Sequence, residues 1–439
     1  MNPDCKNIAG NEQDNFYDAF AEHEKIDTEL EKNFTLAMQQ EQTKPEIKLT
    51  DKGQPAKTIE NFLSILRNDN RFSNVRYNLL TGQAELHHGT KIEAWNDTDD
   101  SQARNYIEAT YKLFDANKLD DALKIYFSEQ AYHPVKELLD ATEWDGIPRI
   151  KTMLSKWLKC DDTPYTQEVS RLIFAGGINR LYNPGCKFDE IPILIGTKQG
   201  EGKSTFVRWL ALNDCFFKEV REIEGQKGVE ALQGGWICEL SELLALTKAK
   251  EVEAVKSYLT CTTDSYRQPY CRHVSHLKRQ CIFIGTTNRT QFLTDRTGNR
   301  RFYPIIVHST AMDLFSHEDE IKTEILQCWS EAKSKLGTAE TRPYADISLK
   351  AEITAAQSTA TEEDYRVGLI MDYIAGMDET CILEVWREAL DNKFIPPSRK
   401  DSNEISMIMQ SLGWKTAGSS RRFLKYGKQK VWTYGTSIV

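Results

Sequence analysis

The sequence predicts an α/β domain with a largely parallel β-sheet over residues 151–345. Short apolar runs alternate there with runs of helical spacing, and buried strands that alternate with helices are typical of a parallel sheet covered by helices. The chain is 40% hydrophobic and 28% charged, an ordinary globular composition that excludes a disordered or fibrous protein. In chain order the runs are IPILIG, FVRWLAL, WICELSEL, EVEAVKSYL, QCIFIGTTN and RFYPIIV.

Shorter segments flank this domain. Residues 1–56 are an acidic arm and linker, whose first 50 residues hold 11 acidic and 5 basic residues. Residues 57–150 predict a small, mainly helical domain, because TIENFLSILRN and DDALKIYFSEQAY have helical spacing, with one hairpin over RFSNVRYNLLTGQAELHH. We expect a linker helix over residues 346–365 and a last unit over residues 366–439.

A Gly-rich loop between a buried strand and a helix is the strongest functional signal. Its glycines let backbone N–H groups turn inward around a phosphate, and the helix directs its positive end to the same point. Lys203 would reach the β- and γ-phosphates, and Ser204 would ligate Mg²⁺. Thr197 stands where the pattern GxxxxGK[ST] has glycine, and the alternative is a chance Gly-rich turn. The predicted NTP site consists of Gly196, Thr197, Lys198, Gln199, Gly200, Glu201, Gly202, Lys203, Ser204 and Thr205.

Two acids follow the next apolar run. GGWICELSEL predicts a strand that ends in Glu239, with Glu242 just beyond it. A hydrolysing site needs an acid at the tip of a neighbouring strand to hold Mg²⁺ and orient water. We assign Glu239 to the metal and Glu242 to polarising water, or the two roles exchanged. The alternative is that both acids only begin the following helix, whose positive end they suit.

A polar strand end and an arginine pair come next. QCIFIGTTN ends in Asn288, which would hydrogen-bond the attacking water or the γ-phosphate, although an Asn in a turn is common. DRTGNRRFYPIIV places Arg300 and Arg301 before a buried strand. Such a pair fits a finger that reaches a γ-phosphate across a subunit interface, and the alternative is surface solvation or a salt bridge.

Several motifs in this order resemble the virulence-associated protein E family: WDGIPRI, GTKQGEGKSTF, WICELSEL, YRQPY and FIGTTNRTQFLTDRTGNRRFYPI. These P-loop proteins of phages, plasmids and chromosomal islands are related to superfamily-3 replicative helicases. The resemblance covers about residues 60–345. It implies an AAA+-like P-loop NTPase core and a hexameric ring with ATP and Mg²⁺ between subunits. By resemblance Lys203 and Ser204 lie on the phosphate loop, Glu239 on the acidic strand, Asn288 on the sensor, and Arg301 or Arg300 on the finger.

Larger relatives carry a primase domain in front of this core. The first 56 residues here are too short and too polar for one, so priming activity is not implied. A separate primase and other replication proteins are therefore candidate partners.

A basic stretch, YRQPYCRHVSHLKRQ, lies between the acidic strand and the sensor strand and contains no acid. Basic residues can follow phosphates while aromatic rings stack or pack. The resemblance implies a hairpin here that projects into the central channel and grips single-stranded DNA. By position, Arg272, His273 and Lys278 are the candidates. Arg267 and Tyr270 instead suit the ATP pocket or the subunit interface.

The last unit combines three expected helices with a basic hairpin, SSRRFLKYGKQKVW, that contains no acid. This pattern predicts a winged-helix-like DNA-binding domain with a recognition helix near residues 402–413 and a basic wing. The alternative is a small packing domain with a solvated charged edge. The residues expected to contact duplex DNA are Arg421, Arg422, Lys425, Lys428 and Lys430.

Two functions stay open at this point. One is an ATP-dependent superfamily-3-type DNA helicase that acts as a homo-hexamer in replication of a phage, plasmid or genomic island. The other is an ATP-dependent origin-binding initiator or adaptor without unwinding activity, and a small-molecule kinase fits the loop alone. No apolar run approaches the roughly 18 residues of a membrane span, and no secretion signal is recognisable. We therefore expect a cytoplasmic protein without a membrane partner.

Overall fold

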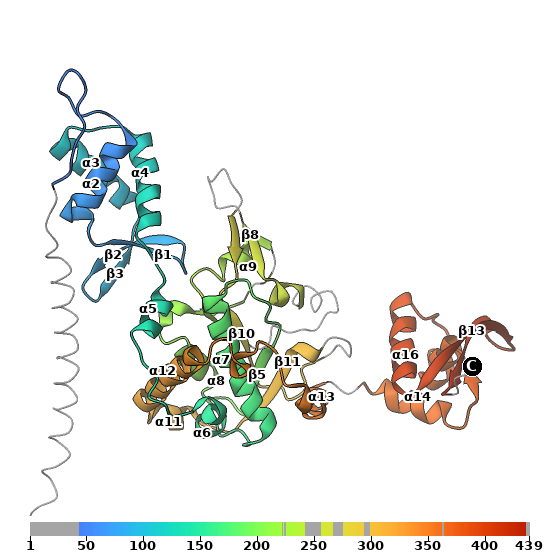
Figure 1. Cartoon of the computed structure of the whole chain (residues 1–439). Helices are drawn as coiled ribbons and strands as arrows, with labels where there is room; N and C mark the ends of the chain where they lie inside the picture. Colours follow the sequence, from blue (N-terminus) through green and yellow to red (C-terminus); the bar gives the residue numbers. More distant parts are fainter. Residues whose placement is uncertain are drawn as a thin grey trace, which may run out of the picture. The chain divides into compact units, whose positions relative to one another are not determined.

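A computed structural model of the chain describes residues 44–221, 223, 225–241, 256–266, 275–293, 299–361 and 364–435 (Figure 1). The described residues divide into two compact units: one comprises the residues up to Thr290 and residues 299–360, and the other comprises residues 291–293 and the residues from Thr361 onward. No helix within the described ranges combines the length and the apolar composition that a membrane crossing requires.

Five parallel strands form the central sheet of the first unit, in the order β11-β5-β10-β7-β6. This confirms the predicted α/β domain with a parallel sheet. Because the strands all point the same way, the residues that follow β5, β7 and β10 gather at one edge, where ligands bind in open parallel sheets. The strands are β5 (Ile191–Gly196), β6 (Phe217–Glu219), β7 (Ile237–Ser241), β10 (Ile282–Thr287) and β11 (Phe302–Val307).

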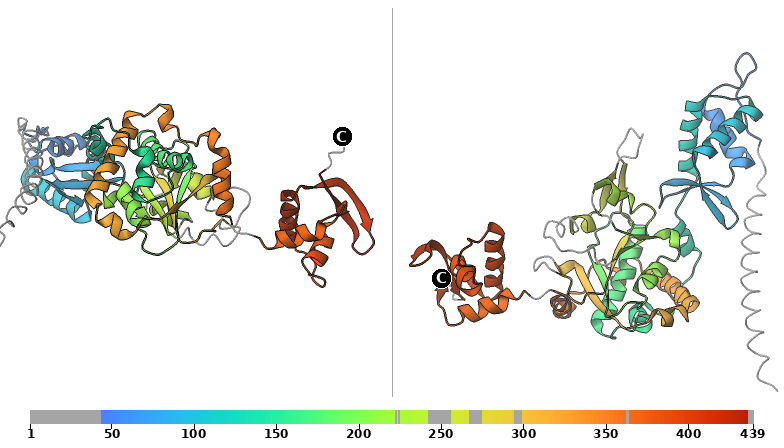
Figure 2. Two further views of the ribbon diagram at one scale, coloured as in Figure 1. Left: turned by 90° about the horizontal axis from the view of Figure 1, so that it is seen from below. Right: turned by 180° about the vertical axis from the view of Figure 1, so that it is seen from behind.

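Helices pack against this sheet, and two further views show them around its strands (Figure 2). Helix α7 has glycines at the two positions where aromatic rings pack directly against its backbone. A Cβ atom on Gly177 would lie 2.4 Å from the Trp329 ring, and one on Gly176 would lie 2.3 Å from the Phe188 ring. The elements are η2 (Ile150–Thr152), α6 (Met153–Trp157), α7 (Pro164–Tyr182), α8 (Lys203–Leu210), η3 (Asp214–Phe216), α9 (Gly225–Glu230), η4 (Asn299–Arg301), α11 (Ala311–Phe315), α12 (Glu318–Ser334), η5 (Ala339–Thr341), η6 (Ile347–Leu349) and α13 (Lys350–Thr359).

Residues 57–150 combine helices with a second sheet, β3-β2-β1-β4. The predicted hairpin is present, since β1 and β2 are antiparallel, and Asn78 Oδ1 accepts the N–H of Leu80 in its turn at 2.8 Å. The sequence pattern does not indicate β3 and β4, because β3 is fully exposed and β4 has two residues. The elements are α2 (Ile59–Asn68), η1 (Asn70–Phe72), β1 (Val75–Asn78), β2 (Gln83–His88), β3 (Lys91–Ala94), α3 (Asp97–Tyr111), α4 (Ala116–Glu129), β4 (Ala131–Tyr132) and α5 (Pro134–Asp140).

The second unit combines helices with a three-stranded antiparallel sheet, β12-β14-β13, whose first strand lies between two of the helices. Helix α16 begins with a capping box, in which Ser398 and Asp401 bond each other's backbone N–H groups with their side chains. Ile370, Trp414 and Trp432 belong to the core of this unit. The elements are α14 (Arg366–Ile374), β12 (Glu379–Thr380), α15 (Ile382–Glu384), the π-helical turn η7 (Val385–Ala389), α16 (Arg399–Ser411), β13 (Trp414–Phe423) and β14 (Gly427–Tyr434).

Candidate nucleotide-binding site

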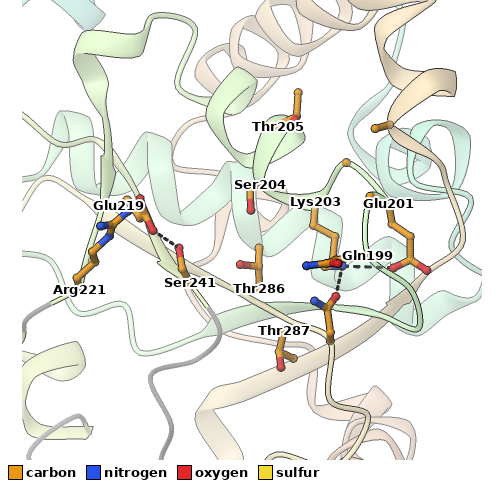
Figure 3. Close-up of a pocket in the computed structure, with 14 residues that line it drawn as sticks. Gln199, Glu201, Lys203, Ser204, Thr205, Glu219, Arg221, Ser241, Thr286 and Thr287 are labelled. Carbon is orange, nitrogen blue, oxygen red and sulfur yellow. Dashed lines mark hydrogen bonds and ion pairs between the residues drawn. The ribbon is translucent and has the colours of Figure 1, made fainter.

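A cavity of about 680 Å³ opens at the carboxyl edge of the central sheet, where the Gly-rich loop joins β5 to α8. Figure 3 shows Glu201 and Lys203 toward one end of it and Glu219, Arg221 and Ser241 toward the other. The structure thus brings most of the predicted loop together with Asn288, which lies 85 residues further along the chain. The lining residues are Gln199, Gly200, Glu201, Gly202, Lys203, Ser204, Thr205, Glu219, Arg221, Ser241, Thr286, Thr287, Asn288 and Ala311.

The loop backbone is held in a tight turn by two glycines and by contacts from α11 and the residues just before it. Gly200 and Gly202 have φ angles of +85° and +75°, in the left-handed region that favours glycine. A Cβ atom on Gly202 would also lie 2.3 Å from Leu314 Cδ1. On the outer side, the N–H of Ala311 donates to Gly200 O at 2.8 Å, and Ser309 Oγ donates to Glu201 O at 2.9 Å.

Gly196 explains why the glycine of the usual pattern is found one residue before Thr197. A Cβ atom on Gly196 would lie 2.0 Å from Lys203 Nζ and 1.9 Å from Glu201 Oε2. The position that must be glycine is therefore the last residue of β5, beneath these two side chains. Thr197 is exposed and donates through its N–H and its hydroxyl to Glu201 Oε1, at 3.1 and 3.2 Å.

Lys203 is the buried cation of the site. It is the first residue of α8 and is 9% exposed, and its Nζ donates to Asn288 Oδ1 at 2.8 Å and to Glu201 Oε2 at 3.3 Å. Asn288 follows β10 directly. Because β10 adjoins β5 in the sheet, the loop lysine and the predicted sensor residue meet at the same point.

Glu239 is the buried acid of the site and lies in β7, beside β10. The prediction that this strand ends at Glu239 is wrong, because β7 continues to Ser241. Its Oε1 accepts hydrogen bonds from Ser204 Oγ at 2.5 Å and from Thr286 Oγ1 at 2.6 Å. Carboxylate and hydroxyl oxygens are ligands that Mg²⁺ prefers, together with substrate phosphates. Ser204 and Glu239 would therefore fit a Mg²⁺ ion, whereas Glu242 lies outside the described residues. No cluster of three or more metal-ligating side chains occurs in the described part of the chain.

Some lining residues were not expected from the sequence. Glu219 ends the short strand β6, beside Glu239 in the sheet, and accepts hydrogen bonds from Arg221 at 2.8 Å and Ser241 at 2.9 Å. The bond from Arg221, and next that from Ser241, lowers the pKa of the Glu219 carboxyl. A strand of three residues shows no periodicity, so FFKEV gave no signal of one. Thr286 belongs to the predicted strand QCIFIGTTN, whose polar end was a usable signal.

Arg300 and Arg301 lie at the opposite edge of the same sheet. They end η4 and precede β11, whose first residue pairs with Ile191 and whose last pairs with Gly196. The arginine pair is thus about six residues, or roughly 20 Å along the strand, from the Gly-rich loop of its own chain. The structure does not bring these two residues into the site that the other predicted residues form.

A two-stranded hairpin, β8 (Thr263–Tyr266) and β9 (Ser275–Lys278), occupies the interval where the basic stretch was noted. Lys278 is exposed and pairs with Thr263 at the base of the hairpin, whereas Arg272 and His273 lie outside the described residues. Arg279 is buried at this base and bonds Asp264 through Nε at 2.7 Å and Nη2 at 2.8 Å. It therefore supports the hairpin internally.

The basic residues of the second unit lie on the β13–β14 hairpin, but they do not share one face. Arg422 is directly opposite Lys428, and Ser420 is opposite Lys430, so Arg422, Lys428 and Lys430 share a face. Arg421 lies between Ser420 and Arg422 on the strand, so its side chain is on the other face, and it forms an ion pair with Glu379. Lys425 is exposed in the turn between the strands.

The fold and the site define an α/β protein with a parallel sheet, a Gly-rich loop at its carboxyl edge and a buried lysine–asparagine–carboxylate arrangement. The family description "Virulence-associated protein E-like domain" matches residues 139–365, which is more than half of the chain. The chain therefore belongs to the virulence-associated protein E-like family, as its motifs predicted.

Solved structures of the NrS-1 C-terminal region resemble this fold. One, the A form apo structure of residues 305–718, has a TM-score of 0.50 and 13% sequence identity, and the match covers 87% of this chain and 100% of that chain. Another A form apo structure of this region has a TM-score of 0.48 and 13% identity, over 82% and 96% of the two chains. At this identity the likeness concerns the fold alone. No curated protein matches the sequence.

Proposed function

We propose that this protein binds and hydrolyses ATP with Mg²⁺ in the cavity at the carboxyl edge of the central sheet. One observation carries the proposal: the adjacent strands β5, β10 and β7 and the helix after β5 bring Lys203, Glu239 and Asn288 together at one Gly-rich loop. The Ser204 hydroxyl bonds Glu239 at the same place. A Gly-rich turn without a function would not be expected to lie beside a buried acid and an amide from two other strands. This arrangement is what phosphoryl transfer requires, since its catalysis is mostly positioning and charge stabilisation.

Each residue has a role in this proposal. Lys203 binds the β- and γ-phosphate oxygens, and Asn288, already bonded to Lys203, orients the attacking water or the γ-phosphate. Ser204 and Glu239 would hold Mg²⁺, which neutralises charge on the phosphates when bound. Glu242 is proposed as the group that polarises water, because it follows the metal acid by three residues.

We further propose a homo-hexameric ring in which Arg300 or Arg301 of one subunit completes the site of the next. The support is geometric, because the arginine pair and the phosphate loop lie at opposite edges of one sheet. An arginine that cannot approach its own site from there can approach that of an adjacent copy. Arginine fingers supplied in trans stabilise charge on the transferred phosphoryl group.

The proposed work of the ring is DNA unwinding in replication of a phage, plasmid or genomic island. Membership in the virulence-associated protein E-like family supports this, and so does the hairpin between β7 and β10, where Lys278 with Arg272 and His273 would contact single-stranded DNA. We propose that the second unit is a winged-helix domain that binds duplex DNA, with α16 as recognition helix.

A second candidate is an ATP-dependent origin-binding initiator without unwinding activity. The observation that favours it is the hairpin face with Arg422, Lys428 and Lys430, which suits duplex DNA and needs no motor. Like charges directly opposite each other destabilise a strand pair, so a bound anion would relieve their repulsion.

Hydrolysis and particle size test these proposals together. ATP turnover of the purified protein is measured with and without single-stranded DNA while light scattering gives the mass of the particle. DNA-stimulated turnover from a hexamer, with strand separation that Lys203→Ala abolishes, supports the helicase. ATP-dependent assembly and origin binding without strand separation support the initiator. A monomer whose ATP turnover does not change with DNA contradicts both the helicase and the ring.

A further inference from the structure

The carboxylate of Glu201 lies inside the phosphate loop. This side chain is 7% exposed, and its Oε1 accepts the backbone N–H groups of Thr197 at 3.1 Å and Lys198 at 3.0 Å. Its Oε2 lies 3.3 Å from Lys203 Nζ. These donors, backbone N–H groups and the loop lysine, are the ones that a phosphate loop offers to nucleotide phosphates. One side chain of the loop therefore takes the donors that the proposed ligand needs.

The position of Glu201 depends on its neighbours in the loop. Gly196 supplies the space, since a Cβ atom there would lie 1.9 Å from Glu201 Oε2. The Thr197 hydroxyl gives Oε1 a third donor at 3.2 Å. Thr197 is also the residue that departs from the usual loop pattern. The departure and the enclosed carboxylate thus belong to one local arrangement.

The backbone of the loop is fixed by contacts that do not involve the Glu201 carboxylate. Ser309 Oγ binds Glu201 O, the N–H of Ala311 binds Gly200 O, and Leu314 packs against Gly202. These contacts come from α11 and from Ser309, just before it. A change of the Glu201 side chain therefore leaves these backbone contacts of the loop in place.

We infer that Glu201 is an internal competitor for the phosphate loop, which the β- and γ-phosphates of a nucleotide displace when they bind. This inference rests on the proposed nucleotide site. Two anions cannot both accept the same backbone N–H groups at full strength, and a carboxylate beside a phosphate adds like-charge repulsion. The nucleotide must break the Glu201 contacts before it binds, so the observed affinity is lower than the affinity of a loop without those contacts. The loop consequently selects ligands with at least two phosphates, because adenosine monophosphate lacks the group that displaces the carboxylate.

Replacement of Glu201 by glutamine tests this inference. The Oε1 of glutamine can still accept the N–H groups of Thr197 and Lys198, but its NH₂ group faces the Lys203 ammonium and cannot bind it. We expect Glu201→Gln to bind ATP and ADP about tenfold more tightly than the unchanged protein, because a hydrogen bond to a charged group is lost from the competing state. The affinity for AMP should not change. Isothermal titration with each nucleotide, with and without Mg²⁺, measures this.

Glu219→Gln is the matched control, since it removes the same charge from the same cavity without touching the loop N–H groups. Any gain that comes only from a less negative cavity will be equal in the two variants, and that result overturns the inference. An unchanged or weaker affinity of Glu201→Gln for ATP, or an equal gain for AMP, overturns it as well. Circular dichroism checks folding, and Glu201→Ser serves as a second variant if glutamine is not tolerated. If the unchanged protein and all variants bind no nucleotide, the proposed function itself fails.

Discussion

The phosphate loop and the β13–β14 hairpin both present cations to the anions that we propose they bind, but they are built in contrasting ways. In the loop, Lys203 is buried and its ammonium is bonded to Asn288 and Glu201. On the hairpin, Arg422 and Lys428 are exposed and opposite each other, and no ion pair is found for either within the described residues.

The difference concerns how much each residue can contribute. A buried, bonded lysine acts at one fixed point, so its loss removes a stabilising charge that no neighbour can replace. Exposed cations on a hairpin act through the sum of many screened contacts, and each contributes a small share. The two regions should therefore respond very differently to single substitutions and to salt.

The largest expected effect is the loss of ATP hydrolysis in Lys203→Ala. We expect turnover to fall by about 100-fold or more, because the buried, preorganised Lys203 ammonium would donate to the charge that develops on the phosphates. Steady-state phosphate release measures it. Lys187→Ala is the control, since the Lys187 side chain is 79% exposed and this residue precedes β5, the strand that leads into the Gly-rich loop. Turnover in Lys203→Ala close to that of the control would contradict the assigned site.

Glu239→Gln should have the next largest effect. Its carboxylate accepts hydrogen bonds from the hydroxyls of Ser204 and Thr286. An amide is a weaker metal ligand than a carboxylate. We expect hydrolysis to fall about 10–100-fold and the Mg²⁺ concentration for half-maximal rate to rise. Mg²⁺ titrations at saturating ATP measure both. A variant that keeps the original Mg²⁺ dependence would show that another residue holds the metal.

The sequence identified the parts of the site that lie in apolar strands or shortly after them, although it ended β7 two residues too early, at Glu239. β5, β7 and β10 are long enough to be visible as apolar runs, so Lys203, Glu239 and Asn288 could be placed on one edge before any contact was known. The partnership of Ser204 and Glu239 follows from the strand order. Pattern reasoning cannot supply that order, because it depends on which strands pair.

Other features leave no trace in local pattern. β6 has three residues, so Glu219 could not be recognised as a strand end. The enclosed position of Glu201 depends on an absent Cβ atom at Gly196, five residues earlier. The five basic residues of SSRRFLKYGKQKVW could be counted from the sequence, but only the register separates Arg421 from Arg422.

That separation gives the third prediction. Arg422→Gln should weaken binding to duplex DNA about threefold to tenfold and reduce the slope of affinity against salt by about one, as expected for one lost phosphate contact. Arg421→Gln is the matched control on the same strand, and it should change affinity less because Arg421 is already paired with Glu379. Fluorescence anisotropy at several salt concentrations measures both. Equal losses would show that the hairpin does not bind through one face.

The smallest expected effect concerns salt and the phosphate loop. Between about 50 and 200 mM KCl, ATP affinity should change less than about threefold, because buried pairs are screened much less than exposed ones. Over the same range, a hairpin that makes three phosphate contacts should lose roughly 40-fold in affinity for duplex DNA. Titration of one preparation with both ligands gives the comparison directly. A steep salt dependence for ATP would mean that exposed cations such as Lys198, and not the buried Lys203, contribute most of the phosphate binding.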